Sequence, residues 1–295
     1  MDMYKLFLIT LLFCGSVNAQ TPLRMLLKKM GSSGGDADSI AFVTKVALNG
    51  GSLTSTEKTA IGTLIKQLKD SLLWDSFQAI YPMVGGSQAS CKVNMRDSNF
   101  NLIFAGNPTI SSTGVSWTGS TFAKTGYIPS INSIAGSFSL SYYSRTNQAA
   151  ANAIEIGCGN YVSGADQSAY LALNLTGSIA KSIIETPQAQ GANYSPITDS
   201  KGLFVASRTS STYNGIYRNG SLLNSNAVAT STSRPAYQIM LGCVNSVITA
   251  GSDRATYVSS KECAFASIGY GLTPAQVATL YNIIQAFETA LSRQV

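Results

Sequence analysis

The chain has 295 residues, of which 45% are hydrophobic and only 12% are charged, about half the usual charged share. With 26 glycines and 14 tyrosines, this composition favours short strands joined by polar turns and excludes a coiled coil or an acidic disordered tail. The formal net charge is +6, but the basic residues are spread thinly, so no nucleic-acid partner is expected. The absence of histidine excludes Ser-His-Asp and Cys-His catalysis and ordinary histidine-containing zinc sites.

Residues 1–19 are typical of a secretory signal peptide. Lys5 lies in a short amino-terminal region, an apolar stretch runs from Leu6 to Phe13, and Val17 and Ala19 are the small residues that signal peptidase requires. The alternative is an uncleaved anchor, which the short apolar stretch disfavours. We therefore expect export and a mature chain that begins at Gln20.

The expected export decides how the cysteines are interpreted. Cys14 would leave with the signal peptide, and Cys91, Cys158, Cys243 and Cys263 would remain. In an oxidising compartment we expect at least one disulfide, and the sequence does not choose among the three pairings. Cys243–Cys263 is slightly favoured because these residues flank one polar loop between consecutive expected strands, at the base of a hairpin. If the chain is not exported, the alternative is buried free thiols.

Residues 20–37 are predicted to be a flexible basic segment, and residues 38–90 a helical lead-in. Asp38 is expected to cap a first helix that ends at Asn49-Gly50-Gly51. Thr54 and Glu57 form a capping box for a second helix. Its apolar face contains Ile61, Leu64, Ile65, Leu68 and Leu72.

The apolar material continues to Pro82 through aromatic and aliphatic residues. At this spacing, core packing is more common than a binding stripe, so we expect a buried role for Trp74, Phe77, Ile80 and Tyr81.

Residues 91–271 change to short β-rich runs separated by polar turns. Asn219-Gly220 predicts a type I′ hairpin turn. Many short strands with no helices between them predict an antiparallel β-sandwich. The expected strands are Phe100–Phe104, Phe122–Ile128, Phe138–Ser144, Ala153–Gly157, Tyr170–Leu175, Leu203–Ser207, Gly215–Arg218, Tyr237–Gly242 and Cys263–Gly269.

Residues 272–295 are predicted to form a closing helix. Thr273 is the expected N-cap, Pro274 the first helical residue, and Gln276 completes a capping box. Leu272 and Val277 are spaced as a hydrophobic staple. We expect this helix to pack on the lead-in helices and on one end of the sandwich.

Three segments resemble the strands of laminin-G-like, concanavalin A-like jelly rolls: Phe138–Tyr143, Gly215–Leu223 and Ile239–Cys243. The ending Glu262–Thr273, with the helix to Phe287 and Arg293-Gln-Val295, is similar to the carboxy terminus of virion structural proteins of phages that infect Bacteroidota, including crAss-like phages. Leu68–Gly86 resembles the helical lead-in of the same proteins. The resemblance implies a jelly-roll β-sandwich, flanked by helices, that serves as a virion surface protein. The signal peptide departs from this pattern, because tailed-phage structural proteins are usually assembled in the cytoplasm.

Retaining glycosidases need two carboxylates about 5–5.5 Å apart, so hydrolysis can be tested on the sequence. The glutamates are isolated, and the acidic residues closest in sequence are Asp36 and Asp38, in the hinge. Glu155 alone lies on an expected strand, where we expect it to be exposed. The sequence therefore predicts no enzyme.

Sugar binding requires less: an aromatic platform with amide and hydroxyl groups around it. The candidate ligand-binding residues are Asn160, Tyr161, Asp166, Tyr213, Asn214 and Asn245, with Tyr194 in a similar loop. The alternative for each is an ordinary turn residue. No cofactor is expected. Ca²⁺ is the alternative, but it needs clustered oxygen ligands, and the loop residues Asp166 and Asp253 are isolated in the sequence.

Arg145 and Arg208 each begin a similar motif after an expected strand, Arg-Thr-Asn and Arg-Thr-Ser. Each arginine could grip an acidic ligand, but anchoring loop carbonyls is the favoured interpretation.

These observations favour a non-enzymatic virion surface protein, namely a spike, fibre or head-decoration subunit with a lectin-like jelly roll that contacts host glycans. We expect a homo-oligomer with other virion proteins as partners, located on the virion surface or outside the cell. The alternative is a secreted bacterial lectin-like adhesin.

Overall fold

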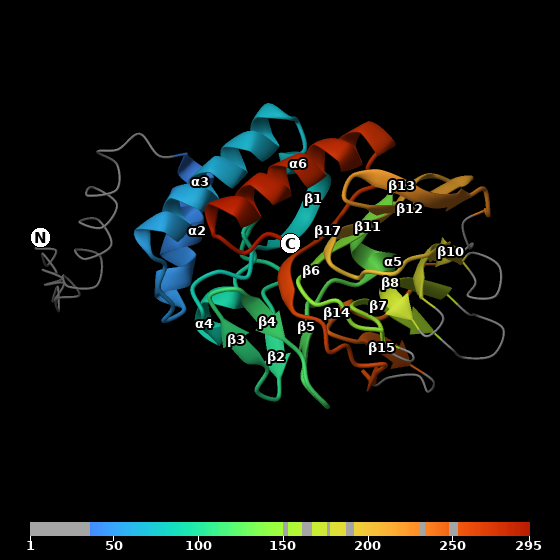
Figure 1. Cartoon of the computed structure of the whole chain (residues 1–295), viewed down its shortest axis with the longest axis horizontal. Helices are drawn as coiled ribbons and strands as arrows, with labels where there is room; N and C mark the ends of the chain where they lie inside the picture. The colour runs from blue at the N-terminus through green and yellow to red at the C-terminus, as the bar shows by residue number, and fades with distance from the viewer. Residues whose placement is uncertain are drawn as a thin grey trace, which may run out of the picture. The chain divides into compact units, whose positions relative to one another are not determined.

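The computed structural model describes residues 36–149, 153–160, 167–175, 178–186, 192–229, 234–247 and 253–295. The expected signal peptide and nearly all of the expected segment 20–37 lie outside the described residues. Within the described residues, two mainly antiparallel sheets form a sandwich, and the three long helices lie together on one side of it (Figure 1). None of the described helices is long and apolar enough to cross a membrane.

The first two helices are α2 (Ala37–Leu48) and α3 (Ser55–Asp70). Asp36 caps α2, because its carboxylate accepts the Asp38 amide at 2.9 Å, so the predicted cap at Asp38 is wrong by two residues. The capping box of α3 is confirmed. Leu72 does not lie on the buried face, because α3 ends at Asp70 and Leu72 is 85% exposed, with a φ of 58°.

The closing helix α6 (Pro274–Ala290) begins as predicted, with Thr273 as N-cap, Pro274 in the first turn and Gln276 completing the capping box. It packs on α3. The short helix η2 (Trp74–Ser76) lies between α3 and the first strand, and two further short helices, α4 (Gln88–Cys91) and α5 (Pro129–Asn132), lie between strands.

Sheet A contains the first and the last strand of the described residues. Its strand order is β13 (Ser221–Asn226), β12 (Tyr213–Arg218), β11 (Gly202–Ser210), β6 (Phe138–Ser144), β17 (Cys263–Gly269), β4 (Gly114–Ser116) and β3 (Thr109–Ser111), and β1 (Phe77–Tyr81) also pairs with β17. β1 lies inside the segment that the sequence predicts to be a helical lead-in. It is a strand because Ala79, Ile80 and Tyr81 pair with β17 near the other end of the chain.

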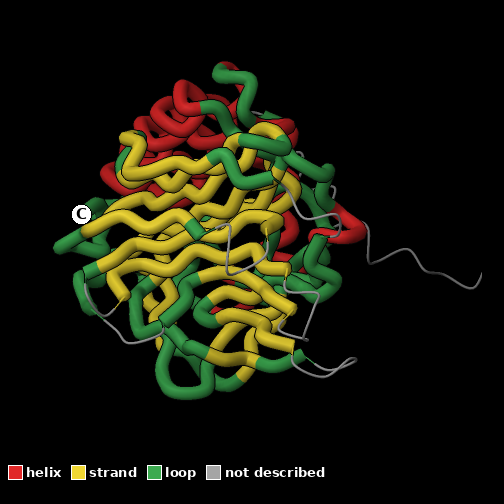
Figure 2. The backbone as a smooth tube through the Cα atoms, turned by 90° about the vertical axis from the view of Figure 1, so that its right-hand side faces the viewer, coloured by secondary structure: helices red, strands yellow, loops and turns green. Residues whose placement is uncertain are grey.

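Sheet B has the order β10 (Asn193–Pro196), β9 (Ile179–Thr186), β8 (Gln167–Leu175), β7 (Ile156–Asn160), β14 (Met240–Leu241), β5 (Phe122–Lys124) and β2 (Ile103–Ala105). β15 (Val244–Val247) runs parallel to β7 and pairs with β16 (Ala255–Thr256). β6 and β17 have the predicted bounds, whereas β9 and β10 are strands that the sequence analysis missed. Seen from the side, strands run alongside one another and the long helices gather at one border (Figure 2).

The hairpin between β12 and β13 turns at Asn219 and Gly220, whose φ angles are 49° and 79°. Two successive positive φ angles are what a type I′ turn requires, so this prediction is confirmed.

The core has two layers, one on each face of sheet A. Leu140 and Phe204 face sheet B, where Leu171 belongs to the same buried cluster. Tyr143 and Val205, from the same strands, face the helices. Every residue of β6 and β17 is therefore buried. The helices pack on each other, as predicted, but they cover the outer face of sheet A, not one end of the sandwich.

Candidate binding surface

Glu155 lies directly before β7 and is fully buried, whereas the sequence predicts an exposed strand residue. Its carboxylate accepts hydrogen bonds from the Leu173 amide at 2.6 Å and the Ser259 hydroxyl at 3.0 Å. It also pairs at 2.9 Å with the ammonium of Lys261, which is fully buried as well. Burial raises the pKa of Glu155, although Lys261 opposes the shift. The prediction is wrong because this carboxylate ties sheet B to the segment that enters sheet A.

Glu185 is a second buried carboxylate, on β9, with a φ of 54°. It accepts hydrogen bonds from the Gly136 amide and the Ser133 hydroxyl, both at 3.0 Å. Burial raises the pKa of Glu185. These contacts hold the loop around α5 against sheet B, so Glu185 also serves the fold.

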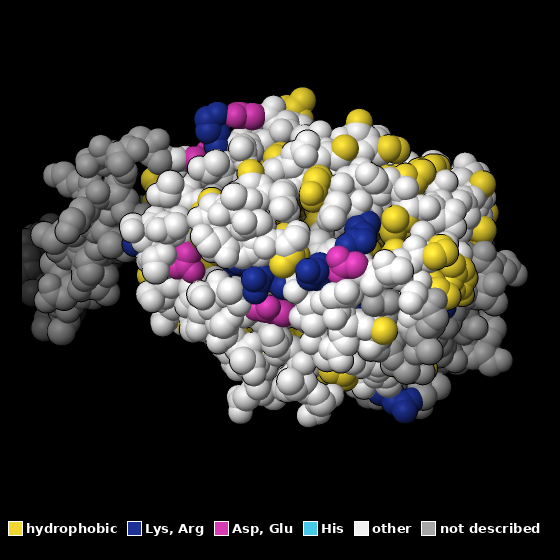
Figure 3. All heavy atoms as spheres, in the orientation of Figure 1, with side chains coloured by type: hydrophobic (Ala, Val, Ile, Leu, Met, Phe, Trp, Pro, Cys, Tyr) yellow, Lys and Arg dark blue, Asp and Glu magenta, His cyan; other side chains and the backbone are white. Residues whose placement is uncertain are grey.

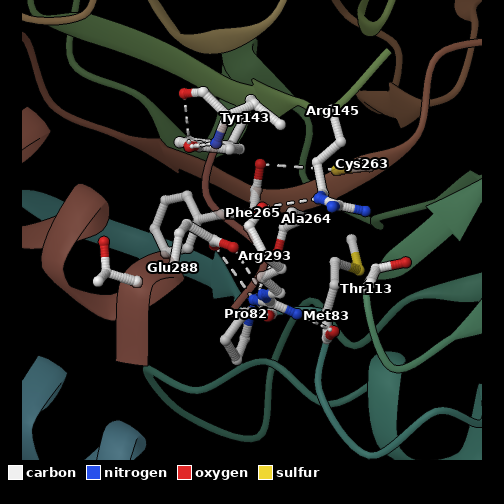
Figure 4. A network of polar contacts seen from close by, with 12 residues as sticks. Pro82, Met83, Thr113, Tyr143, Arg145, Cys263, Ala264, Phe265, Glu288 and Arg293 are labelled. Carbon is white, nitrogen blue, oxygen red and sulfur yellow. Dashed lines mark hydrogen bonds and ion pairs between the residues drawn. The ribbon is translucent and has the colours of Figure 1, made fainter. Parts of the chain in front are cut away.

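The third buried carboxylate, Glu288, belongs to a group that we call the C-terminal clasp: Arg145, Glu262, Glu288 and Arg293. Figure 4 shows Arg145, Glu288 and Arg293 of this group. Arg293 is buried and forms an ion pair with Glu288 at 2.6 Å. Its guanidinium also donates to the carbonyls of three residues at 2.7–3.0 Å: Pro82, Met83 and Ala264. Arg145 donates to the Arg293 carbonyl at 2.7 Å and pairs with Glu262 at 3.0 Å. Burial raises the pKa of Glu288 to about 7.

The clasp also brings two carboxylates, those of Glu262 and Glu288, into one network. Glu262 lies close enough to Glu288 to raise its pKa. Each carboxylate is nevertheless held by its own arginine, and Glu262 also accepts the Thr113 hydroxyl at 2.5 Å. These contacts leave the two acids fixed to the chain and not directed at a substrate.

Arg208 anchors loop carbonyls, as predicted. Its Nε donates to Ile184 at 2.8 Å, and its Nη1 donates to Val228 at 3.1 Å and to Ser210 and Ser211 at 3.3 Å. Arg145 binds the Arg293 carbonyl and the Glu262 carboxylate. Neither arginine points to an outside ligand.

The predicted ligand-binding residues divide between the two sheets. Tyr161 and Asp166 lie outside the described residues. Asn160 ends β7 and pairs with Val247, whereas Asn245, on the neighbouring strand β15 of sheet B, pairs with Cys158. Tyr213 and Asn214 lie on β12 in sheet A. The structure therefore brings Asn160 and Asn245 onto neighbouring strands but places Tyr213 and Asn214 in the other sheet.

Asn245 and Asn214 are both fully buried. The Asn245 amide donates to Asp253 at 2.7 Å and accepts the Arg254 amide at 2.9 Å, so it holds its own loop. Asp253 also pairs with Lys124 at 3.0 Å. Among the described residues, no group of three acidic or cysteine side chains could hold a metal ion.

The predicted disulfide is not found, because Cys91, Cys158, Cys243 and Cys263 are all buried free thiols. Cys243 follows β14 in sheet B, and Cys263 begins β17 in sheet A. The loop between them passes through β15 and β16 and changes sheets, so it does not form the expected hairpin. Burial raises the pKa of all four thiols.

An accessible surface that combines aromatic, aliphatic and cationic groups lies where the edge strands β10 and β13 meet. We define this β10–β13 surface by the residues Lys181, Tyr194, Ile197, Arg218, Leu222 and Leu223. The Asn224 amide donates to the Tyr194 carbonyl at 2.8 Å and joins the two strands. Tyr194 is 50% exposed and Leu222 is 49% exposed. Hydrophobic side chains gather on this side of the sandwich (Figure 3).

A hollow of about 330 Å³ opens on this surface. Its lining combines apolar, hydroxyl and cationic groups, from Ser178, Pro196, Ile197, Thr198, Arg218 and Leu223. The period-two pattern of β10 explains the placement, because Asn193 and Ser195 point inward while Tyr194 and Pro196 point outward.

A second hollow, of about 370 Å³, lies between α3 and α6. Serine, threonine and alanine dominate its lining, which contains no charged residue. It offers neither the exposed aromatic ring nor the cation of the β10–β13 surface, so we take the latter as the candidate site.

Sequence reasoning identified Tyr194 but missed Lys181 and Arg218. The β-branched residues Ile179, Ile183, Ile184 and Thr186 were the available signal for a strand. Such a strand places Lys181 opposite Tyr194 in the sheet. Arg218 lies on an expected strand, but only the tertiary structure shows that it borders a hollow.

No protein-family model and no curated protein matches this chain. Solved structures resemble it distantly. Domain 4 of a GH43 extracellular arabinanase from Geobacillus stearothermophilus, in complex with arabinotriose, is 12% identical over 70% of this chain and 98% of that one, with a TM-score of 0.44. A botulinum neurotoxin type C structure, from a study of its interaction with two ganglioside molecules, is 14% identical over 73% and 53%, with a TM-score of 0.49.

A mutant Trypanosoma rangeli sialidase with trans-sialidase activity is 12% identical over 77% of this chain and 39% of that one, with a TM-score of 0.46. This chain thus spans only about half, or less, of the toxin and sialidase structures. At these identities and TM-scores the likenesses assign no family and no function.

Proposed function

We propose that this protein is a non-enzymatic virion surface subunit, a spike, fibre or head-decoration protein, that binds host-surface glycans through the β10–β13 surface. The observation that carries the binding role is the contrast between buried acids and this open surface. The buried glutamates are engaged by the chain itself, whereas the surface presents a half-exposed tyrosine beside a hollow.

The surface has the groups that sugar recognition needs. An aromatic ring can stack against the apolar face of a sugar, and hydroxyl and cationic groups around a hollow can fix its orientation. Tyr194 supplies the ring, and Thr198 and Arg218 line the adjacent hollow.

A shallow site of this kind binds weakly by itself, because desolvation and ordering offset much of the contact energy. Several copies presented together raise the effective concentration and recover avidity. We therefore include a homo-oligomer, with other virion proteins as partners, in the proposal.

The virion role is supported by the resemblance of Glu262–Thr273 and Arg293–Val295 to structural proteins of phages that infect Bacteroidota. The signal-peptide pattern of residues 1–19 favours a second candidate, a secreted bacterial lectin-like adhesin. Both candidates share the exported mature chain that begins at Gln20.

The test of binding without turnover pairs a glycan array with a reducing-sugar release assay on the purified mature chain. We expect binding that Tyr194→Ala weakens, no sugar release, and an oligomer by light scattering. Sugar release that Glu155→Gln or Glu288→Gln abolishes would overturn the non-enzymatic role.

Mass spectrometry of purified particles and of cleared culture medium separates the two candidates. Peptides from this chain in particles support the virion subunit, and peptides only in the medium support the adhesin. Amino-terminal sequencing that reads Gln20 supports export, whereas Met1 in the mature protein contradicts it.

A further inference from the structure

Positive charge exceeds negative charge around the β10–β13 surface. Arg218 pairs with Asp199 at 2.9 Å, and the half-buried Lys201 is two residues from Asp199 in sequence. Neither Lys181 nor Lys201 lies within 4.0 Å of a carboxylate of any described residue. Around this surface, the three cations Lys181, Lys201 and Arg218 therefore accompany one carboxylate, that of Asp199.

Lys181 is held between two aromatic rings. Its ammonium lies 5.1 Å from the centre of the Tyr194 ring and 5.5 Å from that of Tyr170. Cation–π contacts keep the ammonium in place without neutralising its charge. Tyr194 thus places an exposed ring and a fixed cation at the same point.

Arg218 is also pre-oriented. Its Nη2 binds Asp199, and its Nε donates to the Lys201 carbonyl at 3.1 Å. Its Nη1 donates to no described residue, and the side chain borders the hollow. A guanidinium held in this way can accept an anion with little loss of conformational entropy.

We propose that the β10–β13 surface binds an anionic saccharide, with the ring stacked on Tyr194 and a carboxylate or sulfate group directed to Lys181 and Arg218. This inference rests on the proposed glycan-binding function and names its ligand class. Charge complementarity supports this inference, because a bound anion would neutralise part of the excess positive charge of the described residues around the surface. A hollow of about 330 Å³ lies at the lower end of the range for small-ligand sites, which suits one or two sugar rings.

Isothermal titration calorimetry tests the proposal with three probes: trigalacturonic acid, a heparin-derived tetrasaccharide and neutral galactotriose. We expect at least one anionic probe to bind about tenfold more tightly than galactotriose at low salt, with binding that weakens as salt rises. A preference for the uronate assigns the carboxylate as the recognised group, and a preference for the heparin fragment assigns the sulfate; either result supports the inference.

Two variants locate the site. Lys181→Met should weaken anionic binding about tenfold, the loss of one charge-assisted contact, and leave any galactotriose binding unchanged. Tyr194→Ala should weaken binding of every probe. The matched controls are Lys58→Met, an exposed lysine on α3, and Tyr257→Ala, a ring that is 48% exposed elsewhere, and both should bind as the wild type does.

The outcomes separate the two proposals. Equal binding of neutral and anionic probes, unchanged by Lys181→Met, would overturn the anionic ligand class and leave the glycan-binding function standing. Binding of no saccharide, on the array or in solution, by a folded oligomer would overturn both.

Discussion

The C-terminal clasp and the β10–β13 surface use arginine in opposite ways. Arg293 is 1% exposed, and its guanidinium binds three carbonyls and one carboxylate of the chain. The Arg218 side chain is 24% exposed, and one of its terminal nitrogens donates to no described residue. Burial therefore decides the role of each cation: in the clasp the charge stabilises the fold, and at the edge strands it remains accessible to a ligand.

The largest expected effect is on the clasp. Arg293→Met should lower the free energy of unfolding by about 3–5 kcal/mol, because Glu288 and three carbonyls would stay buried without their partner. Urea unfolding of the variant and the wild type measures the loss.

The double variant Arg293→Met/Glu288→Leu is the control. Removing both charges should recover much of the lost stability, because no unpaired ion is then buried. A loss below about 1 kcal/mol in the single variant would contradict the contrast between clasp and surface.

The second prediction concerns pH. Burial raises the pKa of Glu288 from 4.5 to about 7, so the folded state binds this proton more tightly than the unfolded state. The stabilisation is full below about pH 4.5 and is lost as the pH rises through about 7. Glu155 and Glu185 shift in the same direction.

Unfolding measured from pH 5 to pH 8 should therefore show falling stability. Glu288→Gln should remove roughly 2–3 kcal/mol of this change, at about 1.4 kcal/mol for each pKa unit. An identical pH profile for the variant would show that Glu288 keeps its ordinary pKa.

The third prediction tests how much the N-terminal cap of α3, one of the helices that cover sheet A, contributes to the free energy of unfolding. Thr54→Ala should cost about 1 kcal/mol, since it removes the hydroxyl that accepts the Glu57 amide. Thr59→Ala, an exposed site within the same helix, should be nearly neutral. Equal losses in thermal unfolding would show that the cap contributes nothing specific.

The smallest stability effect is expected at the β10–β13 surface. Lys181→Met should change the free energy of unfolding by less than about 1 kcal/mol, because only the cation–π contacts with Tyr170 and Tyr194 are lost and no described carboxylate depends on this ammonium. A loss comparable to that of Arg293→Met would mean that Lys181 serves the fold, and the comparison would fail.

The sequence predicted the sandwich, its flanking helices and several local devices correctly. Both capping boxes and the Asn219-Gly220 turn are where the sequence indicates, because each depends on residues within a few positions of one another. The full burial of β6 was not predicted, because alternation reports one buried face and the helix cover supplies the second.

The candidate site was only partly predictable. Tyr194 could be identified as a loop aromatic, but its cationic neighbours follow from an unexpected strand and from the meeting of two sheet edges. The residues that carry the phage resemblance include Glu262 and Arg293, and the structure gives both a role in the clasp.

The sequence by itself determined the helix caps, the hairpin turn and the mainly β character, because these rest on local hydrogen bonds and side-chain periodicity. Only the tertiary structure decided that Glu155 is buried, that Cys243 and Cys263 belong to different sheets, and that Arg293 closes the clasp. Those outcomes depend on contacts between distant segments, such as the Arg293–Met83 hydrogen bond across 210 positions. Local patterns do not encode such contacts, because they arise only when the sheets and helices pack together.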